Sequence, residues 1–340
     1  MKRFTLMAAF MAITLTLSAQ KVALHASTGI QHFTGTSALS EAYVAAISGD
    51  TIYLPGGGFT SPGTIDKKLL VFGAGHYPDS TAVTSKTVIS GNISLTENAD
   101  GFHIQGVDIT GGIYSLPNES VNQIIIKYCR LLGNLEIRGD QSNPSFNLML
   151  VNSVVQGVVR LENAQNAGFF NSMFNGEING SYGNLFQNNI FMLNNRSNMV
   201  YRYTLHGDNN TLENNIFLRT LDREINGNSN IIKNNITPKT DPYWGATPVL
   251  ENNYTGVELT SIFVNQTGNI FDYTHNYHLQ APETYPGVDG ITQVGIYGGY
   301  HPYKEGAVPS NPHFVSSKIA PQTDAEGKLK IEIQVAAQDN

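Results

Sequence analysis

Between residues 152 and 255 the chain repeats one short pattern: an asparagine, a second small polar residue, and then usually two apolar residues. The six copies are Asn152–Val155, Asn171–Phe174, Asn188–Phe191, Asn214–Phe217, Asn234–Thr237 and Asn252–Thr255. Successive copies begin 19, 17, 26, 20 and 18 residues apart. A period of about twenty residues is typical of a solenoid, in which each repeat forms one turn of the coil.

Other segments complete each turn. Gly106–Ile109 and Tyr128–Leu131 occupy the places of two earlier copies, which gives an average interval of about 21 residues. Apolar strands precede the pattern at 123–126, 147–150 and 229–232, and further strands follow it at 135–138, 159–162, 177–179, 204–206 and 224–226. Three short strands per turn predict an all-β fold, a single-stranded right-handed parallel β-helix.

Asparagine suits the corner between two such strands. It tolerates a left-handed backbone, and its amide can bond to the same residue one turn away, as in stacked cross-β structures. We therefore expect an asparagine ladder along the coil.

The two ends of the coil depart from this pattern. Residues 37–47 have apolar side chains at helical spacing after Ser37, which predicts a short N-terminal helix that caps the first turn. Residues 301–340 contain four prolines, and Lys328–Val335 alternates as one strand. We expect an extended tail that lies along the solenoid or covers its last turn, or that docks another module.

The first residues are typical of a secretory signal peptide. Two basic residues precede the apolar run Phe4–Leu17, and Ser18–Gln20 provides small residues for cleavage near Ala19. We expect residues 1–19 to be removed and the protein to be secreted, periplasmic or on the cell surface. The β-helix then spans residues 20–300, and no later apolar run is long enough for membrane insertion.

Composition narrows the choice of partners. Charged residues make up 14% of the chain, against about 25% in typical soluble domains, and the net charge is −7. No basic block is present, so nucleic acid and anionic membranes are not expected partners. The single cysteine, Cys129, forbids an internal disulfide, and we expect it to be a buried filler and not a reactive thiol.

Several segments resemble pectin-lyase-like β-helix proteins. They are Ala42–Pro55, Val71–Gly75, Gly101–Ile109, Tyr277–Pro282 and Gly295–Gly299, so the resemblance covers about residues 25–300. It implies the parallel β-helix fold, with polysaccharide lying in a groove along one stacked sheet. It does not imply one activity, because that superfamily contains lyases, hydrolases, adhesins and inert scaffolds.

The third strand of each turn offers the best candidate groove. We expect Ile137, Leu161, Ile178, Leu205 and Ile225 to face inward in one column. The outward side chains then form two columns, Glu136, Arg160, Glu177, Thr204, Glu224 and Arg138, Glu162, Asn179, His206, Asn226. Two interpretations stay open: these charges pair across neighbouring strands, or they line a binding groove.

Aromatic and cationic residues extend this candidate site. The 26-residue interval places Tyr201, Arg202 and Tyr203 beside the columns, where they suit sugar rings and uronate carboxylates. Trp244 either displays a second sugar platform or packs against the wall of the coil.

Two kinds of catalysis are known for grooves of this type, and each requires particular residues. Hydrolysis of the polygalacturonase type needs paired carboxylates, and none of that family's motifs, such as Gly-His-Gly, occurs here. Lyase chemistry needs a base and a cation or calcium ion beside a uronate carboxylate. Leu135–Gly139 and Tyr203–Thr211 resemble segments of alginate and chondroitin lyases, but Gly180–Ser181 stands where that family has its lysine.

The sequence therefore predicts a secreted β-helix protein that binds or scaffolds polysaccharide, uronate-containing or neutral, without a complete catalytic set. The first alternative is a polysaccharide lyase that uses Arg138, Arg160, Arg202 and His206, with calcium as its possible cofactor. The second alternative is a structural or adhesion module of the cell surface. No histidine, cysteine or carboxylate spacing requires a metal site.

Overall fold

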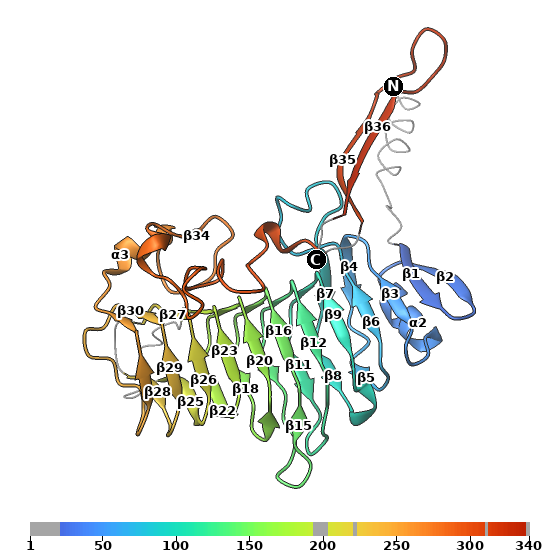
Figure 1. Ribbon diagram of the computed structural model, residues 1–340. Helices are drawn as coiled ribbons and strands as arrows, with labels where there is room; N and C mark the ends of the chain where they lie inside the picture. Colours follow the sequence, from blue (N-terminus) through green and yellow to red (C-terminus); the bar gives the residue numbers. More distant parts are fainter. Residues whose placement is uncertain (1–20, 193–202, 220–222, 310–311, 338–340) are drawn as a thin grey trace, which may run out of the picture.

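The computed structural model describes residues 21–192, 203–219, 223–309 and 312–337, and these form a β-helix with three stacked sheets (Figure 1). Sheet A contains β1 (Lys21–Ala26), β2 (Gly29–Thr34), β3 (Thr51–Tyr53), β6 (Leu70–Phe72), β9 (His103–Gln105), β12 (Ile125–Lys127), β16 (Met149–Val151), β20 (Gly168–Phe170), β23 (Leu185–Gln187), β26 (Thr211–Glu213), β29 (Ile231–Lys233) and β31 (Val249–Glu251). Sheet B contains β4 (Gly57–Thr60), β7 (Thr87–Ser90), β10 (Asp108–Ile109), β13 (Arg130–Leu131), β17 (Val154–Val155), β21 (Met173–Phe174), β24 (Ile190–Phe191), β27 (Ile216–Phe217), β30 (Ile236–Thr237) and β32 (Tyr254–Thr255). Sheet C contains β5 (Thr64–Ile65), β8 (Ile93–Leu95), β11 (Ile113–Ser115), β14 (Leu135–Glu136), β18 (Val159–Arg160), β22 (Ile178–Tyr182), β25 (Tyr203–Asp208) and β28 (Arg223–Asn226).

The remaining elements lie at the corners and ends of the coil. They are α2 (Ala38–Ala45), α3 (Leu259–Ile262), the 3₁₀ helices Glu97–Ala99, Pro282–Thr284 and Glu305–Ala307, and the paired strands β15 (Ser145–Phe146) with β19 (Ala164–Gln165), β33 (Phe263–Asn265) with β34 (Asn276–Leu279), and β35 (His313–Ile319) with β36 (Ile331–Ala336). From β3 to β31 the strands of sheet A pair in parallel. The prediction of a parallel β-helix is confirmed; the sense of the coil stays a prediction.

Stacked side chains fill the interior because each turn repeats the same inward positions. The ring of Phe169 stacks on that of Phe186 at 4.7 Å, and Phe191 stacks on Phe217 at 4.8 Å. Cys129 is fully buried, as predicted, and burial raises the pKa of its thiol to about 12. Burial of this apolar column is the main source of stability.

The first asparagine of each repeat forms the corner between sheets A and B. All six have a left-handed backbone, with φ between 48° and 59°. Tyr128 (φ 52°) and Gly106 (φ 70°) hold the same conformation in the two preceding turns. The expected left-handed corner is therefore present in eight turns, and asparagine accommodates it without the strain that most residues incur.

The second polar residue of each repeat points into the coil and bonds to the next turn. The Nδ2 of Asn189 donates to Oδ1 of Asn215, Asn215 donates to Asn235, and Asn235 donates to Asn253, each at 3.0 Å. Each acceptor oxygen also receives the backbone N–H of the preceding asparagine. In the two preceding turns the same position holds Ser153 and Ser172. There the Ser172 hydroxyl accepts a hydrogen bond from the backbone N–H of Ser153 at 3.1 Å, so a hydroxyl replaces the amide.

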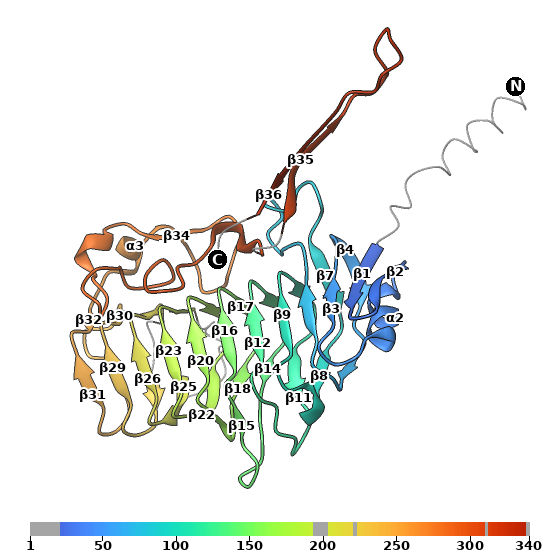
Figure 2. The ribbon, with the colours of Figure 1, turned by 45° about the vertical axis from the view of Figure 1, so that its right-hand side comes forward.

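A strap, residues 257–309, runs back along the A–B corner toward the first turns (Figures 1 and 2). The first asparagines of five repeats bond to it, and Asn214 does so by accepting the backbone N–H of Val288. Asn171 donates to the carbonyls of Ile296 and Gly298 at 2.7 and 2.8 Å. Asn188, Asn152 and Asn234 donate to strap carbonyls at 2.9 to 3.1 Å. The strap therefore crosses the turns in the reverse of their order in the chain.

The strap buries the outward face of sheet B in a second apolar cluster. Val154, Met173, Ile190, Ile216 and Ile236 pack there against strap residues. Near the first turns the strap is held by aromatic rings: the Tyr77 hydroxyl lies 2.9 Å from that of Tyr303, and His76 Nδ1 lies 3.2 Å from the Tyr273 hydroxyl. Sheet B is thus covered on both faces.

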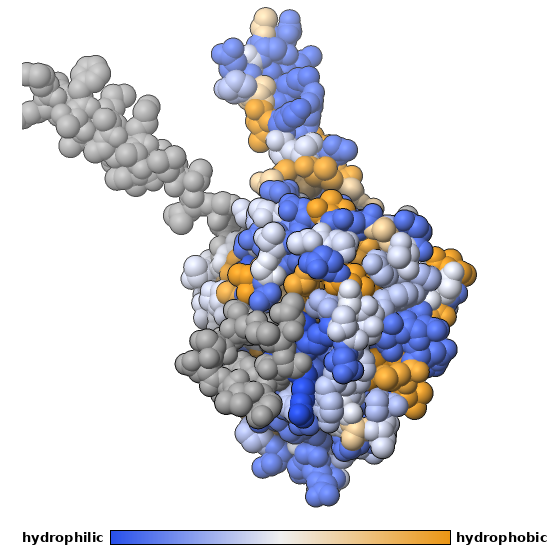
Figure 3. Space-filling model, turned by 90° about the vertical axis from the view of Figure 1, so that its left-hand side faces the viewer, coloured by the Kyte–Doolittle hydropathy of each residue, from blue (hydrophilic) through white to orange (hydrophobic). Residues whose placement is uncertain are grey.

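The two ends of the coil are built differently. At the N-terminal end α2 buries Ala38, Leu39 and Ala42, so the expected helix is present, and its capping role stays a prediction. At the other end Val249 is 55% exposed and Leu250, which continues an interior column, is 52% exposed. Figure 3 shows this end, where hydrophobic residues form separate patches among hydrophilic ones.

The tail differs from the expectation. The described part contains two antiparallel strands, β35 and β36, and not one, and they project from the first turns as a hairpin (Figure 2). It does not cover the last turn, where Leu250 is open to solvent. The strand that the sequence did not predict is β35, because the apolar residues of His313–Ile319 do not alternate strictly. The boundary of the β-helix at residue 300 stays a prediction.

Candidate binding face on sheet C

The outward face of sheet C holds most of the polar residues that the sequence singles out. Its interior column is Leu135, Val159, Ile178, Leu205 and Ile225, all fully buried. The predicted interior column is therefore wrong by two residues between Leu161 and Ile178: Ile137 and Leu161 are buried, but they lie beside this column. A shift of two residues keeps the same side chains outward, because side chains alternate along a strand.

The register error changes the charged columns. Arg160 pairs with Asn179 and not with Glu177. Asn179 instead donates to Glu177, the residue just before its strand, at 3.2 Å. Val159 and Ile178 each lie seven residues after the first asparagine of their turn, Asn152 or Asn171, whereas the prediction aligned Ile178 with Leu161, nine residues after Asn152.

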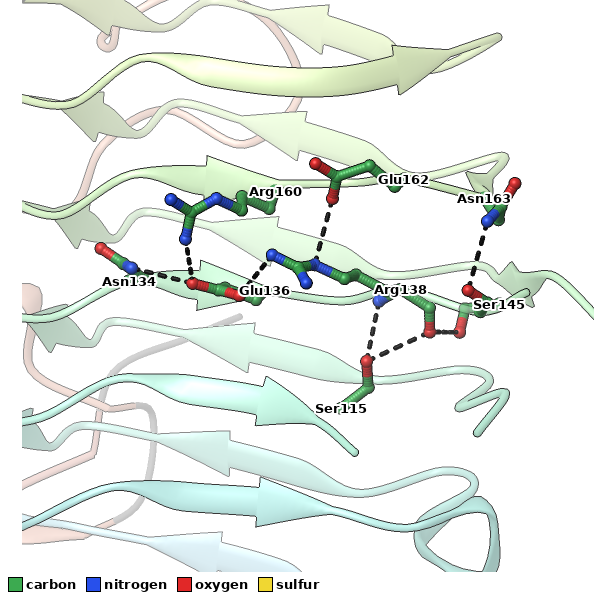
Figure 4. A network of polar contacts seen from close by, with 9 residues as sticks. Ser115, Asn134, Glu136, Arg138, Ser145, Arg160, Glu162 and Asn163 are labelled. Atoms are coloured by element: carbon green, nitrogen blue, oxygen red, sulfur yellow. Dashed lines mark hydrogen bonds and ion pairs between the residues drawn. The ribbon is translucent and has the colours of Figure 1, made fainter. Parts of the chain in front are cut away.

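Four charges on β14, β18 and the residues after them form one network (Figure 4). The Arg138 guanidinium contacts Glu136 Oε2 at 2.7 Å and Glu162 Oε2 at 3.1 Å. Arg160 contacts Glu136 Oε1, which also accepts a hydrogen bond from Asn134 Nδ2 at 2.8 Å. Two arginines and two glutamates thus neutralise one another. The charges pair across neighbouring strands, and each exposed pair contributes about 0–1 kcal/mol.

His206 lies beyond this network in an open depression of about 440 Å³. Tyr182, Asp208, Asn226 and Asn228 also line it, and the Tyr182 ring is 54% exposed. His206 Nδ1 lies 3.2 Å from Asn226 Nδ2, and its ring packs edge-on against Tyr203. Burial lowers the pKa of His206, and the Glu177 carboxylate opposes part of this shift. Burial therefore favours the neutral form of this imidazole.

Of these lining residues only His206 was in the predicted binding set, and Asn226 was expected in an outward column without a binding role. Tyr182 and Asp208 come from the last residues of β22 and β25, which are longer than the other strands of sheet C. The expected strands ended at residues 179 and 206. A signal was present, because Ser181–Tyr182 and Gly207–Asp208 continue the alternation of small and polar residues.

Glu224 is not part of the outward face, contrary to the prediction. It is fully buried, it contacts Lys239 Nζ at 3.3 Å and it accepts a hydrogen bond from Thr237 at 3.0 Å. Burial raises the pKa of this carboxyl, and the Lys239 charge works against that change. Thr204 is buried as well. The sequence did not reveal this, because Lys239 comes from a loop outside the third strands.

Trp244 is 5% exposed and packs edge-on against Phe217 at 5.3 Å, so it is not a sugar platform. Its neighbour Tyr243 is 40% exposed and lies under the Arg223 guanidinium at 4.6 Å. Tyr203 is also buried and supports His206. The predicted residues Tyr201 and Arg202 lie outside the described residues.

The lyase candidates are not gathered around one point in the described structure. Arg138 and Arg160 are bound by the two glutamates, and Asn179 separates the Arg160 strand from the His206 strand. Two strand spacings correspond to about 10 Å. Among the described residues, no group of three histidine, cysteine or carboxylate side chains could hold a metal ion. None of the described helices is long and apolar enough to span a membrane.

No family model matches the chain, and no curated protein sequence matches it either. The parallel β-helix is supported by the strand pairing in the structure, and the resemblance to pectin-lyase-like proteins stays a hypothesis.

Proposed function

We propose that this protein binds polysaccharide on the outward face of sheet C, centred on the depression around His206. The observation that carries the proposal is the open depression itself, with an exposed tyrosine ring beside amide, imidazole and carboxylate groups. Such a mixture suits a sugar, which presents apolar C–H faces and hydroxyl groups at its edges. Export after removal of residues 1–19, the right-handed coil and a place in the pectin-lyase-like superfamily belong to the same proposal.

The charges favour a neutral sugar in the depression over a uronate. Asp208 lines it, and Glu177 is close enough to act on His206. The arginines that would attract a uronate carboxylate are neutralised by Glu136 and Glu162. A negatively charged ligand would therefore meet net repulsion at His206. These four residues, Glu136, Arg138, Arg160 and Glu162, form a charged quartet that serves as a rigid wall of the binding face.

Substitution of residues that line the depression tests this function. Soluble β-glucan, xylan, mannan, alginate and pectate serve as probes in affinity electrophoresis and calorimetry. We expect a neutral glycan to bind the wild-type protein, and Tyr182→Ala and His206→Ala to weaken it about tenfold each. Phe314→Ala, which removes an exposed aromatic ring from the distant hairpin, is the matched control. Unchanged affinity in both depression variants would disprove the proposal.

Lyase activity is the second candidate, because the neutral imidazole of His206 is the protonation state that a general base requires. It predicts that alginate or pectate is cleaved to an unsaturated product that absorbs in the ultraviolet, and that His206→Ala abolishes this signal. Binding of neutral glycans without cleavage of any uronate polymer, with or without calcium, would exclude it for these substrates.

A further inference from the structure

The outward face of sheet A carries a hollow of about 410 Å³ that the charged columns do not include. Met149, Gly168 and Leu185 follow one another across strands β16, β20 and β23 and form its floor. Asn147, Asn166 and Asn209 stand at its rim, and Asn166 donates to Asn147 at 2.5 Å. None of the residues that line it is charged.

The ring of Phe170 lies in this hollow, and it fits because position 168 is a glycine. A Cβ at Gly168 would lie 2.4 Å from the Phe170 ring, so the ring occupies the space above this glycine. Gly168 does not have a positive φ, which means that space and not backbone conformation requires a glycine here. The ring is half-buried, and His301 of the strap packs against its edge at 5.6 Å.

We propose that this hollow is a second subsite, and that it binds an uncharged pyranose ring of a neutral polysaccharide. The flat Phe170 ring offers its electron-rich face to the weakly positive C–H groups of the sugar. The rim amides provide both donors and acceptors for its hydroxyl groups. The uncharged lining excludes attraction of a uronate or a phosphate.

The hollow adjoins the His206 depression around the C–A corner. Tyr182 and Asp208 line the depression, and the residues that follow them, Gly183 and Asn209, line the hollow. Nothing lies within 4 Å of the Cβ position of Gly183, whose φ of 65° matches the left-handed asparagines at the same corner in other turns. No side chain at Gly183 therefore blocks the surface between the two subsites, and one sugar chain can reach both. The proposal of this continuous path rests on the proposed function, whereas the proposal of the hollow does not.

Phe170→Ala tests the hollow directly. We expect it to weaken binding of a neutral polysaccharide by about tenfold and to leave the thermal unfolding temperature within a few degrees of wild type. Phe170→Tyr, which keeps the ring, should restore most of the affinity, and Phe314→Ala should not change it. Equal affinity of folded Phe170→Ala and wild type, or no neutral glycan bound by wild type, would overturn the proposal.

A second variant separates the hollow from the depression. Gly183→Asn keeps the left-handed corner, as Asn147, Asn166 and Asn209 do, but places a side chain on the surface between the two subsites. It should weaken a long glycan several-fold and leave a disaccharide unaffected, whereas equal loss for both would overturn the continuous path. If His206→Ala has no effect while Phe170→Ala does, the proposed function of sheet C fails and the hollow stands.

Discussion

The two polar positions of the repeat can hold the same residue and yet do different work. Asn188 and Asn189 are adjacent and both are buried. The first takes a left-handed backbone and donates to the strap, over a hundred residues away in the chain. The second points inward and donates to the next turn. The first position therefore depends on both backbone conformation and amide, and the second depends on its amide.

The inner position should be the more sensitive of the two. Asn215→Ala removes two donated and two accepted hydrogen bonds. It leaves the backbone N–H of Asn189 and one N–H of its side-chain amide without partners in the interior, while the same amide still donates to the Phe169 carbonyl. Loss of buried partners costs about 1–3 kcal/mol for each orphaned group. We expect a loss of about 3 kcal/mol or more in urea unfolding, and a loss below 1 kcal/mol would refute this role. Ser172→Ala, with a single interturn acceptor, should cost less.

The first turns sharpen the comparison, because aromatic rings and not asparagines hold the strap there. Burial, with the charges of Arg130 and Lys86, lowers the pKa of His76 to about 3. The unfolded chain therefore binds a proton below pH 6.5 that the folded chain rejects, so stability falls as the pH drops from about 6.5 toward 3. Between pH 6.5 and 5 this amounts to about 2 kcal/mol. His76→Gln should remove this part of the slope; an identical slope in both proteins would show that His76 is not its source.

The outer position separates backbone from side chain. Asn171→Gly keeps the left-handed corner and loses the two bonds to Ile296 and Gly298, which should cost about 1 kcal/mol. Asn171→Ala loses the same bonds and adds about 1 kcal/mol of backbone strain. Thermal unfolding of the two variants measures the difference. Equal stability would mean that the corner conformation has no cost.

The charged quartet should have the smallest effect. Arg160→Ala breaks one contact to Glu136, which keeps its contacts to Arg138 and Asn134. We expect less than about 1 kcal/mol in low salt and a smaller change in 1 M salt, since these groups are partly exposed. A loss as large as that of Asn215→Ala would contradict the ranking.

The periodic part of the structure was predictable because every turn must form the same corner. Asn152 to Asn252 marked the turns correctly, and Tyr128 and Gly106 extended them without any asparagine. The strap was not predictable, since its partners are far apart in sequence and its own residues have no period. The burial of Glu224 was missed for the same reason, because Lys239, which contacts it, lies in another segment. For Trp244 the sequence left two alternatives open, and its contact with the distant Phe217 decides for packing against the wall.

The candidate site was predicted in part. His206 and the four charges of the quartet were placed on the correct face, because alternation along a strand survives an even register shift. Phe170 and its hollow were not anticipated. Gly168 looks like an ordinary strand glycine until the ring above it is seen.

Because the strap runs back to the first turns, it determines the end of the coil at which the protein could be attached to a surface. Lys21, at the start of the described chain, and His313, just beyond the strap, line one common hollow beside the first turns. Lys21 and the start of the hairpin therefore both lie at the end of the coil formed by the first turns, and neither lies at the opposite end, where Leu250 is exposed. If the protein were attached to a surface through either of these segments, its first turns would face that surface, and its later turns and the His206 depression would point away from it.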